Sequence, residues 1–185
     1  MINIVPFPVL ETERCLLRQM KVEDAADLYQ IFSDAEVTKD MGIDPLDNIG
    51  QAEGIIHFMN QLYDQKSAFR WGIIRKADGK LIGTCGYNGW EIQRGSRGEI
   101  AYDLGKAYWR QGYMSEVLQS AISFGFDTMS LHRIEAFTNM DAVPSMKLLE
   151  RMGFKEEGIL RGYAMFHGQF CDQRCYSLLK LEWNS

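Results

Sequence analysis

The chain has 185 residues, a length that fits one compact domain and is short for two. A hydrophobic content of 46% and a charged content of 24% are ordinary for a globular protein with a buried core. The net charge of −5 argues against a general nucleic-acid-binding protein, which usually carries a basic face, and it suits a site that receives a cationic amine.

The first third of the chain predicts one strand followed by two helices. The strand is expected at Cys15 to Met20, and the first helix begins after Asp24, a plausible N-cap, because apolar residues recur at helical spacing as far as Phe32. A polar loop from Asp40 to Gly50 separates this helix from the second, which is expected at Gln51 to Gln65.

Three strands follow in succession and predict an antiparallel meander. They are expected at Phe69 to Arg75, Lys80 to Trp90 and Gly98 to Leu104. Asp78-Gly79 lies between the first two and is a strong signal for a tight hairpin, because both residue types tolerate the backbone angles of such turns.

The pattern then changes to alternating helix and strand. Apolar residues recur with helical periodicity from Met114 to Gly125, and Arg133 to Thr138 predicts a strand. Val143 to Met152 predicts another helix, which ends at Gly153, a typical C-terminal cap.

Two final strands are expected, joined by the hairpin turn His167-Gly168-Gln169: Phe154 to Phe166 and Phe170 to Leu181. The element order β-α-α-β-β-β-α-β-α-β-β predicts an α/β (α+β) fold in a single domain, residues 1–185, with a mixed sheet of about seven strands flanked by four helices. The helix between the fourth and fifth strands favours a right-handed crossover and makes those two strands locally parallel in a mostly antiparallel sheet.

The fourth strand leads into the loop Arg110-Gln111-Gly112-Tyr113-Met114-Ser115, where the long helix begins. The free N–H groups and the positive dipole end of a helix start can hold an anion such as a pyrophosphate. Gly112 allows close approach of the backbone, Arg110 adds a charge-assisted contact, and Ser115 is a candidate helix cap. An ordinary strand-to-helix turn is the alternative, and the loop matches neither the Rossmann nor the Walker pattern.

Three segments in order carry a wider pattern: Leu10 to Arg18; Glu99 to Leu104 running on through Tyr108 to Glu116; and Asn139 to Ser145 followed by Leu149 to Phe154. Together they resemble the GNAT superfamily, most closely its RimJ/RimL-like branch of ribosomal-protein N-acetyltransferases. The resemblance spans nearly the whole chain. Trp109 and Met114 occupy the first and last positions of a loop that usually reads Arg/Gln-x-x-Gly-x-Gly/Ala in that superfamily.

The resemblance implies acetyl-CoA as cosubstrate, bound in a splayed cleft between the fourth and fifth strands, and no metal. Backbone groups near Leu104 would pair with the pantetheine arm, and Asn139 would contact the pantetheine region unless it is only a turn residue. The pyrophosphate would lie on the loop whose residues are Arg110, Gln111, Gly112, Tyr113, Met114 and Ser115.

Acetyl transfer needs a deprotonated amine, a donor for the oxyanion and, in some enzymes, a proton for the departing thiolate. Ser145 resembles the serine that this branch places near the CoA sulfur, although serine is common in the first turn of a helix anyway. Glu157 matches a glutamate that faces the acceptor amine in related enzymes and is the first candidate base. Glu99 is the rival, because other members use a carboxylate on the strand beside the cofactor. Either carboxylate is alternatively a solvated strand residue, and a bridging water is another route for the proton.

The acceptor that the resemblance implies is the N-terminal α-amine of a protein, such as a ribosomal protein. Tyr102 and Tyr163 are candidates to line the acceptor cleft, although an aromatic residue on a strand is more often core. The alternatives are a small-molecule amine (a polyamine or an antibiotic) and a non-catalytic acyl-CoA-binding module. Relatives often pair as homodimers, so a homodimer is a further expectation.

The four cysteines show no framework of a small secreted domain, and neither a signal peptide nor a membrane-spanning stretch is recognisable. We therefore expect reduced thiols in a cytoplasmic protein. Cys171 and Cys175 have the alternative of binding a metal, but no second Cys or His pair at ligand spacing accompanies them, so packed thiols are favoured.

Overall fold

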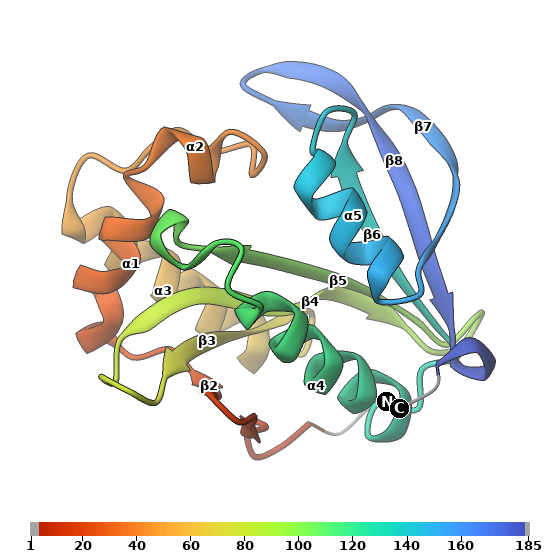
Figure 1. Cartoon of the computed structure of the whole chain (residues 1–185), viewed down its shortest axis with the longest axis horizontal. Helices are drawn as coiled ribbons and strands as arrows, with labels where there is room; N and C mark the ends of the chain where they lie inside the picture. The colour runs from red at the N-terminus through yellow and green to blue at the C-terminus, as the bar shows by residue number, and fades with distance from the viewer. Residues whose placement is uncertain (1–3, 184–185) are drawn as a thin grey trace.

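The structure, a computed structural model, describes residues 4–183. One eight-stranded sheet runs through it in the order β1-β2-β3-β4-β5-β6-β8-β7 (Figure 1). The strands are Leu10–Glu11 (β1), Cys15–Gln19 (β2), Phe69–Arg75 (β3), Leu81–Glu91 (β4), Arg97–Leu104 (β5), Arg133–Asn139 (β6), Lys155–Phe166 (β7) and Gln169–Leu179 (β8). The helices are Ala25–Phe32 (α1), Ala35–Thr38 (α2), Ile49–Asp64 (α3), Tyr113–Asp127 (α4) and Val143–Arg151 (α5).

All seven predicted strands and all four predicted helices are present, and the predicted fold class is confirmed. The sequence did not predict β1 and α2, which have two and four residues. Segments this short carry no periodicity, because one helical turn or one strand pairing shows no repeat. Local hydrogen bonding holds α2 instead, since the Asp34 carboxylate accepts the N–H of Glu36 at its start.

Two hydrophobic clusters pack against the sheet. The larger joins strand residues such as Trp71 and Ile73 to Val117 and Leu118 of α4. The second gathers buried residues of α1 and α3 with their strand neighbours: Met20, Ala25, Leu28, Ile31, Phe32, Val37, Ala52, Ile56, Ile74 and Leu81. Helices therefore cover both faces of the sheet, and Figure 1 shows α4 and α5 each lying along a different half of it.

The predicted turns are confirmed. Gly79, with φ +72°, turns the chain between β3 and β4. His167 and Gly168, with φ +48° and +77°, make the β7–β8 turn, as the twist of a two-residue hairpin requires. Gly153 has φ +89° and ends α5, where the N–H of Phe154 donates to the Leu149 carbonyl at 3.0 Å.

Asp24 does not cap α1 as predicted. Its backbone is already helical, and its carboxylate accepts the Lys21 N–H at 2.8 Å and two bonds from Arg18, both at 2.8 Å. It thus closes the single 3₁₀ turn Val22–Asp24 that precedes the helix and fastens that turn to β2. The predicted capping role of the Asp24 side chain was therefore wrong, because a 3₁₀ turn begins before the apolar periodicity of α1 does.

Candidate active site

β5 and β6 are parallel neighbours that pair over three residues and then separate. Arg97, Gly98 and Glu99 face Arg133, Ile134 and Glu135. Beyond this point β5 continues along β4, while β6 continues along β8. The strands therefore diverge toward their carboxyl ends, as Figure 1 shows, and the predicted splay between these two strands is confirmed.

The open edge of β5 ends at Leu104. Because the Gly105 N–H donates to the Ile82 carbonyl at 2.8 Å, the alternation of an antiparallel ladder turns the Leu104 backbone groups away from β4 and toward the open side. The indole N–H of Trp109 donates to the Leu104 carbonyl at 2.6 Å. One lone pair of that carbonyl remains for a ligand donor, so Leu104 stays a predicted contact.

The loop before α4 forms a concavity of backbone donors. Arg110 and Gly112 both have positive φ, +60° and +81°, and the first bond into the helix is from the Glu116 N–H to the Gly112 carbonyl. Within residues 4–183, the N–H groups of residues 111–115 have no acceptor. Successive free N–H groups beside left-handed residues, at the positive end of a helix, can bind an anion.

Two side chains of this loop differ from expectation. Ser115 is the third residue of α4 and not its cap, because the helix begins at Tyr113 directly after Gly112. The Met114 side chain is buried in the larger hydrophobic cluster, so only the backbone of Met114 faces the concavity. The bulk of this side chain is therefore accommodated by the core.

Arg14, which lies outside the loop, fastens it to the sheet. Its backbone N–H and its Nε donate to the two carboxylate oxygens of Glu116 at 2.7 and 2.6 Å, and Nη1 donates to the Gln111 carbonyl at 2.9 Å. The guanidinium stacks on the Tyr113 ring at 4.3 Å. Its Nη2 lies 3.4 Å from where a Cβ of Gly112 would be, so a positive charge borders the concavity.

Ser145 and Tyr102 meet across the diverging strands. Ser145 lies in the first turn of α5, after Pro144, and its Oγ is 2.8 Å from the Tyr102 hydroxyl on β5. Burial raises the pKa of Tyr102 well above its ordinary value, so the phenol keeps its proton at neutral pH. A hydroxyl pair at this place can pass a proton toward an anion that forms between the strands.

Glu99 lies on the other face of β5, at the last position that pairs with β6. Side chains three residues apart on a strand point to opposite faces, so Glu99 and Tyr102 flank the start of the opening from two sides. Asn88 donates to the Glu99 carboxylate at 3.0 Å. Burial raises the pKa of Tyr163 on β7, and the nearby charges of Glu99 and Glu135 raise it further.

Glu157 is held in a tight ion pair. Both of its oxygens accept from the Arg133 guanidinium at 2.6 Å, and the Ser177 hydroxyl donates to one of them at 2.6 Å. These contacts lower the pKa of Glu157 to about 2, the Arg133 bonds most of all. Arg133, which holds Glu157, is paired in the sheet with Arg97. Arg97 lies two residues before Glu99 on β5, which is about 7 Å along the strand, on the side where β5 and β6 are still paired. This geometry favours Glu99 over Glu157 as a proton acceptor, since a base with so low a pKa is weak at neutral pH.

Asn139 ends β6 and connects the two sides of the opening. Its amide donates to Asp40, which follows α2, at 3.1 Å, and its carbonyl oxygen accepts from Gln173 of β8 at 3.3 Å. The residues after α2 also approach the β7–β8 turn, where His167 lies 3.1 Å from Asp44. The predicted role of Asn139 beside the pantetheine arm stays a prediction.

The sequence profile of the GNAT acetyltransferase domain matches residues 14–155. The chain belongs to the GNAT acetyltransferase family. It is accordingly an N-acetyltransferase, and the predicted enzyme class is confirmed.

Relatives and solved structures agree with this family. The chain is 44% identical over 174 residues to an uncharacterized N-acetyltransferase, p20, of Bacillus licheniformis, covering 94% of this chain and 97% of that protein. It is 30% identical over 127 residues to the [ribosomal protein uS5]-alanine N-acetyltransferase of Escherichia coli, covering 68% of this chain and 64% of that protein. The fold is similar to Mycobacterium smegmatis RimJ in complex with CoA-disulfide, with a TM-score of 0.86, 19% identity and coverage of 96% and 90%.

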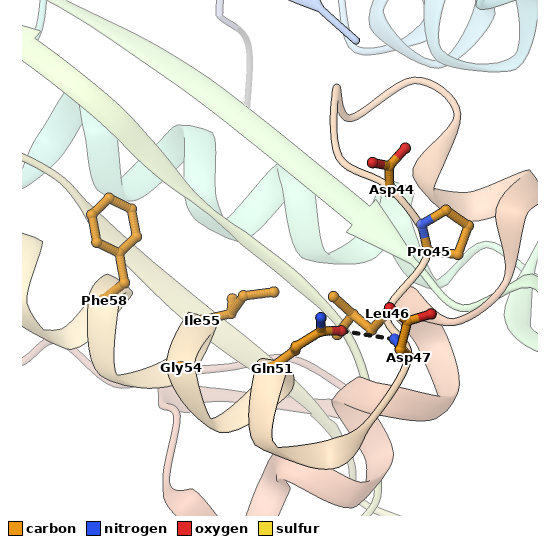
Figure 2. A pocket seen from close by; sticks show the side chains of 8 residues that line it. All are labelled: Asp44, Pro45, Leu46, Asp47, Gln51, Gly54, Ile55 and Phe58. Carbon is orange, nitrogen blue, oxygen red and sulfur yellow. Dashed lines mark hydrogen bonds between the residues drawn. The ribbon is translucent and has the colours of Figure 1, made fainter.

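Two pockets lie beside α3 in this GNAT domain. Figure 2 shows Gln51, Ile55 and Phe58 projecting from α3 toward a pocket of about 460 Å³, which the loop residues Asp44 and Asp47 border. A second pocket of about 210 Å³ also has Phe58 in its lining, together with these residues of α3, β3 and β4: Met59, Leu62, Ala68, Phe69, Arg70, Tyr87 and Asn88. Phe58 therefore borders both pockets, and Asn88, which contacts Glu99, lines the second.

Sequence reasoning missed the polar residues behind Glu99. Arg70 and Asp103 form a buried ion pair at 2.9 Å, with side chains 12% and 4% exposed. A charge inside an apolar strand was the available signal, because it requires a partner on a neighbouring strand. Asn88 carried no such signal, because a β-bulge in β4 places it.

Within residues 4–183, no group of three or more His, Cys, Asp or Glu side chains has the arrangement of a metal site. In the same residues no helix is both long and apolar enough to cross a membrane. Cys15, Cys85 and Cys175 are buried, and burial raises the pKa of the Cys85 thiol to about 12.

Proposed function

We propose that this enzyme transfers the acetyl group of acetyl-CoA directly to the α-amine of a protein N-terminus. The observation that carries the cosubstrate is the separation of β5 from β6, with the concavity of free N–H groups before α4 beside it. The E. coli relative, an alanine N-acetyltransferase of ribosomal protein uS5, supports the acceptor.

The residues at the concavity fit a pyrophosphate. The N–H groups of residues 111–115 lack acceptors within the described chain, and Gly112 has no side chain to keep an anion at a distance. Tyr113, Met114 and Ser115 would contribute backbone donors, and Arg14 and Arg110 positive charge. Leu104 and Asn139 would hold the pantetheine arm along the open edge.

Bound acetyl-CoA supplies an activated acetyl thioester. The protein has to orient the amine against this thioester, and well-oriented reacting pairs gain roughly 7–11 kcal/mol over free ones. The leaving thiolate needs little further help, so we assign one donor to it. Ser145 donates the proton, and Tyr102, 2.8 Å behind it, stabilises the serine oxygen.

For the base we propose Glu99, acting directly or through one water. It lies where the strands separate, whereas Glu157 is engaged by Arg133 and Ser177. A carboxylate next to the opening also attracts the ammonium form of the acceptor before deprotonation. The two variants Glu99→Gln and Glu157→Gln decide between these carboxylates.

The test is a thiol-release assay with purified protein, acetyl-CoA and four kinds of amine. These are peptides with a free N-terminal Ala or Ser, the same peptides blocked at the N-terminus but carrying a lysine, spermidine, and an aminoglycoside. Thiol release confined to free-terminus peptides, with acetylation located by mass spectrometry on the first residue, is the expected result.

Turnover confined to spermidine or the aminoglycoside would overturn the acceptor and keep the enzyme class. Acetylation of the lysine in the blocked peptides would move the acceptor to side chains. No turnover with any amine, alongside calorimetric binding of CoA, would favour an acyl-CoA-binding module.

A further inference from the structure

A continuous chain of hydrogen bonds connects the interior of the sheet to Glu99. Arg70 Nη2 donates to Asp103 Oδ2 at 2.9 Å, and Arg70 Nη1 donates to Asn88 Oδ1 at 3.0 Å. Asn88 Nδ2 then donates to Glu99 Oε1 at 3.0 Å. Each link has ordinary hydrogen-bond length, so the orientation of Glu99 is coupled to a buried ion pair.

The buried end of this chain is rigid. Arg70 Nε donates to the Thr84 hydroxyl at 2.6 Å, and that hydroxyl donates to Asp103 Oδ2 at 2.6 Å. The Thr84 N–H donates to the other Asp103 oxygen at 3.1 Å. The contacts of Nε with Thr84 and of Nη2 with Asp103 therefore fix the plane of the guanidinium, and a planar guanidinium transmits that orientation to its next acceptor, Asn88.

The chemistry of the two neighbours fixes the orientation of the Asn88 amide. A guanidinium has only donors, so the amide atom that faces Arg70 is the oxygen. An ionised carboxylate has only acceptors, so the amide nitrogen must face Glu99. A flipped amide would set donor against donor and acceptor against acceptor.

The backbone places Asn88 for this task. β4 pairs Tyr87 with Ile100 and Gly89 with Glu99, so Asn88 is the extra residue of a β-bulge. A bulge re-aims the side chain of its extra residue and interrupts regular pairing. Here it allows one short side chain to reach a residue on each neighbouring strand, Arg70 on β3 and Glu99 on β5.

We propose that Asn88 is a positioning residue for the base: oriented by Arg70, its amide keeps the Glu99 carboxylate aimed at the opening between β5 and β6. The inference rests on the proposed function, in which Glu99 takes the proton of the acceptor amine. It assigns to Asn88 the role of a hydrogen-bond donor that orients Glu99, a role that a neighbouring ionised carboxylate cannot perform.

The other charged groups around Glu99 make this donor necessary. Glu135 lies opposite on β6, where Arg97 at 3.3 Å and Arg133 at 2.7 Å neutralise it, and Tyr163 of β7 lies near both carboxylates. Within the described chain, Asn88 is the one hydrogen-bond donor to the Glu99 carboxylate. Asn88 is therefore the described group that fixes the direction of the Glu99 carboxylate.

The experiment compares Asn88→Asp and Asn88→Ala with wild type over pH, using kcat/KM for the best peptide. In Asn88→Asp, Arg70 holds the new carboxylate ionised, and its repulsion moves the acid limb of the profile upward by about one pH unit. That shift gives about a tenfold loss at pH values below the limb and near-normal rates above it. Asn88→Ala is expected to move the limb in the same direction by less.

Asn60→Asp is the matched control. Asn60 lies on α3, and its amide donates to the Met20 carbonyl, away from the opening. Its acid limb is expected to stay with wild type. A second readout follows the carboxylates of ¹³C-labelled glutamate by NMR, with the Glu99 signal assigned through Glu99→Gln. Its titration midpoint is expected to rise in Asn88→Asp, whether or not the enzyme turns over.

An unmoved acid limb in Asn88→Asp, or an equal loss at every pH, would overturn the inference, because a merely structural role does not depend on pH. An unmoved NMR midpoint would overturn it independently of activity. Full activity in Glu99→Gln would instead remove the base from the proposed function, while the NMR measurement would still test the coupling of Asn88 to Glu99.

Discussion

The paired and the separated parts of β5 and β6 use polar groups in opposite ways. Where the strands pair, charges neutralise one another: Arg133 binds both Glu135 and Glu157, and Arg97 adds a second contact to Glu135. Beyond the pairing, the Ser145 and Tyr102 hydroxyls bond each other, and the N–H groups of residues 111–115 have no acceptor within the described residues. Ion pairs thus hold the junction of the two strands together, whereas the donors that we propose for acetyl-CoA are uncharged, and Glu99 lies at the boundary between the two parts.

The sharpest test of this contrast is Glu99→Gln. Removing a general base costs about 10²–10⁴ in rate, so kcat/KM should fall at least about 100-fold. The affinity for CoA, measured by calorimetry, should stay within about twofold, because Glu99 lies on the face of β5 opposite Tyr102 and Ser145. A loss below tenfold would mean that the boundary carboxylate is not the base.

The second test breaks the concavity on the open side. Gly112→Ala forces a Cβ into a left-handed residue (φ +81°), a cost of roughly 1–2 kcal/mol, and brings it toward Arg14. We expect CoA to bind about tenfold more weakly by calorimetry. Gly79→Ala is the matched control, because Gly79 has φ +72° with open space around it. If both variants lose stability equally and CoA binding is unchanged in both, the anion site lies elsewhere.

A smaller effect is expected from the hydroxyl pair. Ser145→Ala should lower kcat about three- to tenfold, because a thiolate leaves readily and one hydrogen bond is worth about 1 kcal/mol. Tyr102→Phe should have the same sign, and the double variant should lose little more than Ser145→Ala, since the two act in series. Independent, multiplying losses would show that Tyr102 does not act through Ser145.

The same contrast explains how much of the molecule the sequence predicts. The long elements were predictable, because Met114 to Gly125 and the meander strands repeat with the period of a helix or a strand. The loop at Gly112 was predictable too, since a glycine before an amphipathic helix indicates an anion site without any tertiary contact. Local patterns therefore captured the fold, and they placed the proposed anion site at the start of α4.

Contacts between distant segments were not predictable from these patterns. Arg14 reaches Glu116 over 102 positions, and Glu157 reaches Arg133 over 24, so neither partner is visible from its neighbours in sequence. Glu157 looked like a free carboxylate for this reason. The family resemblance predicted Ser145 near the CoA sulfur, which stays a prediction, and it carried no information about which carboxylate an arginine already holds.

The smallest expected effect comes from the paired side, in Glu157→Gln. Arg133 and Ser177 lower the pKa of Glu157 from 4.5 to about 2, so the ion pair stabilises the folded protein at any pH above about 4.5. That contribution is lost as the pH falls from about 4.5 toward about 2. The Glu157 side chain is 46% exposed, and solvent screening reduces its worth to about 1 kcal/mol.

Urea unfolding of wild type and Glu157→Gln should therefore differ by about 1 kcal/mol at pH 7, and the difference should shrink at pH 3, where wild type begins to lose the same ion pair. Glu53→Gln, an exposed change on α3, is the control and should show no difference at either pH. Because Glu157 only fastens the junction, kcat/KM should stay within about threefold of wild type at pH 7, since a general base would cost far more. A 100-fold loss of kcat/KM with unchanged stability would reverse the assignment: Glu157 would be the base, and the Arg133 ion pair would have to open when the acceptor binds.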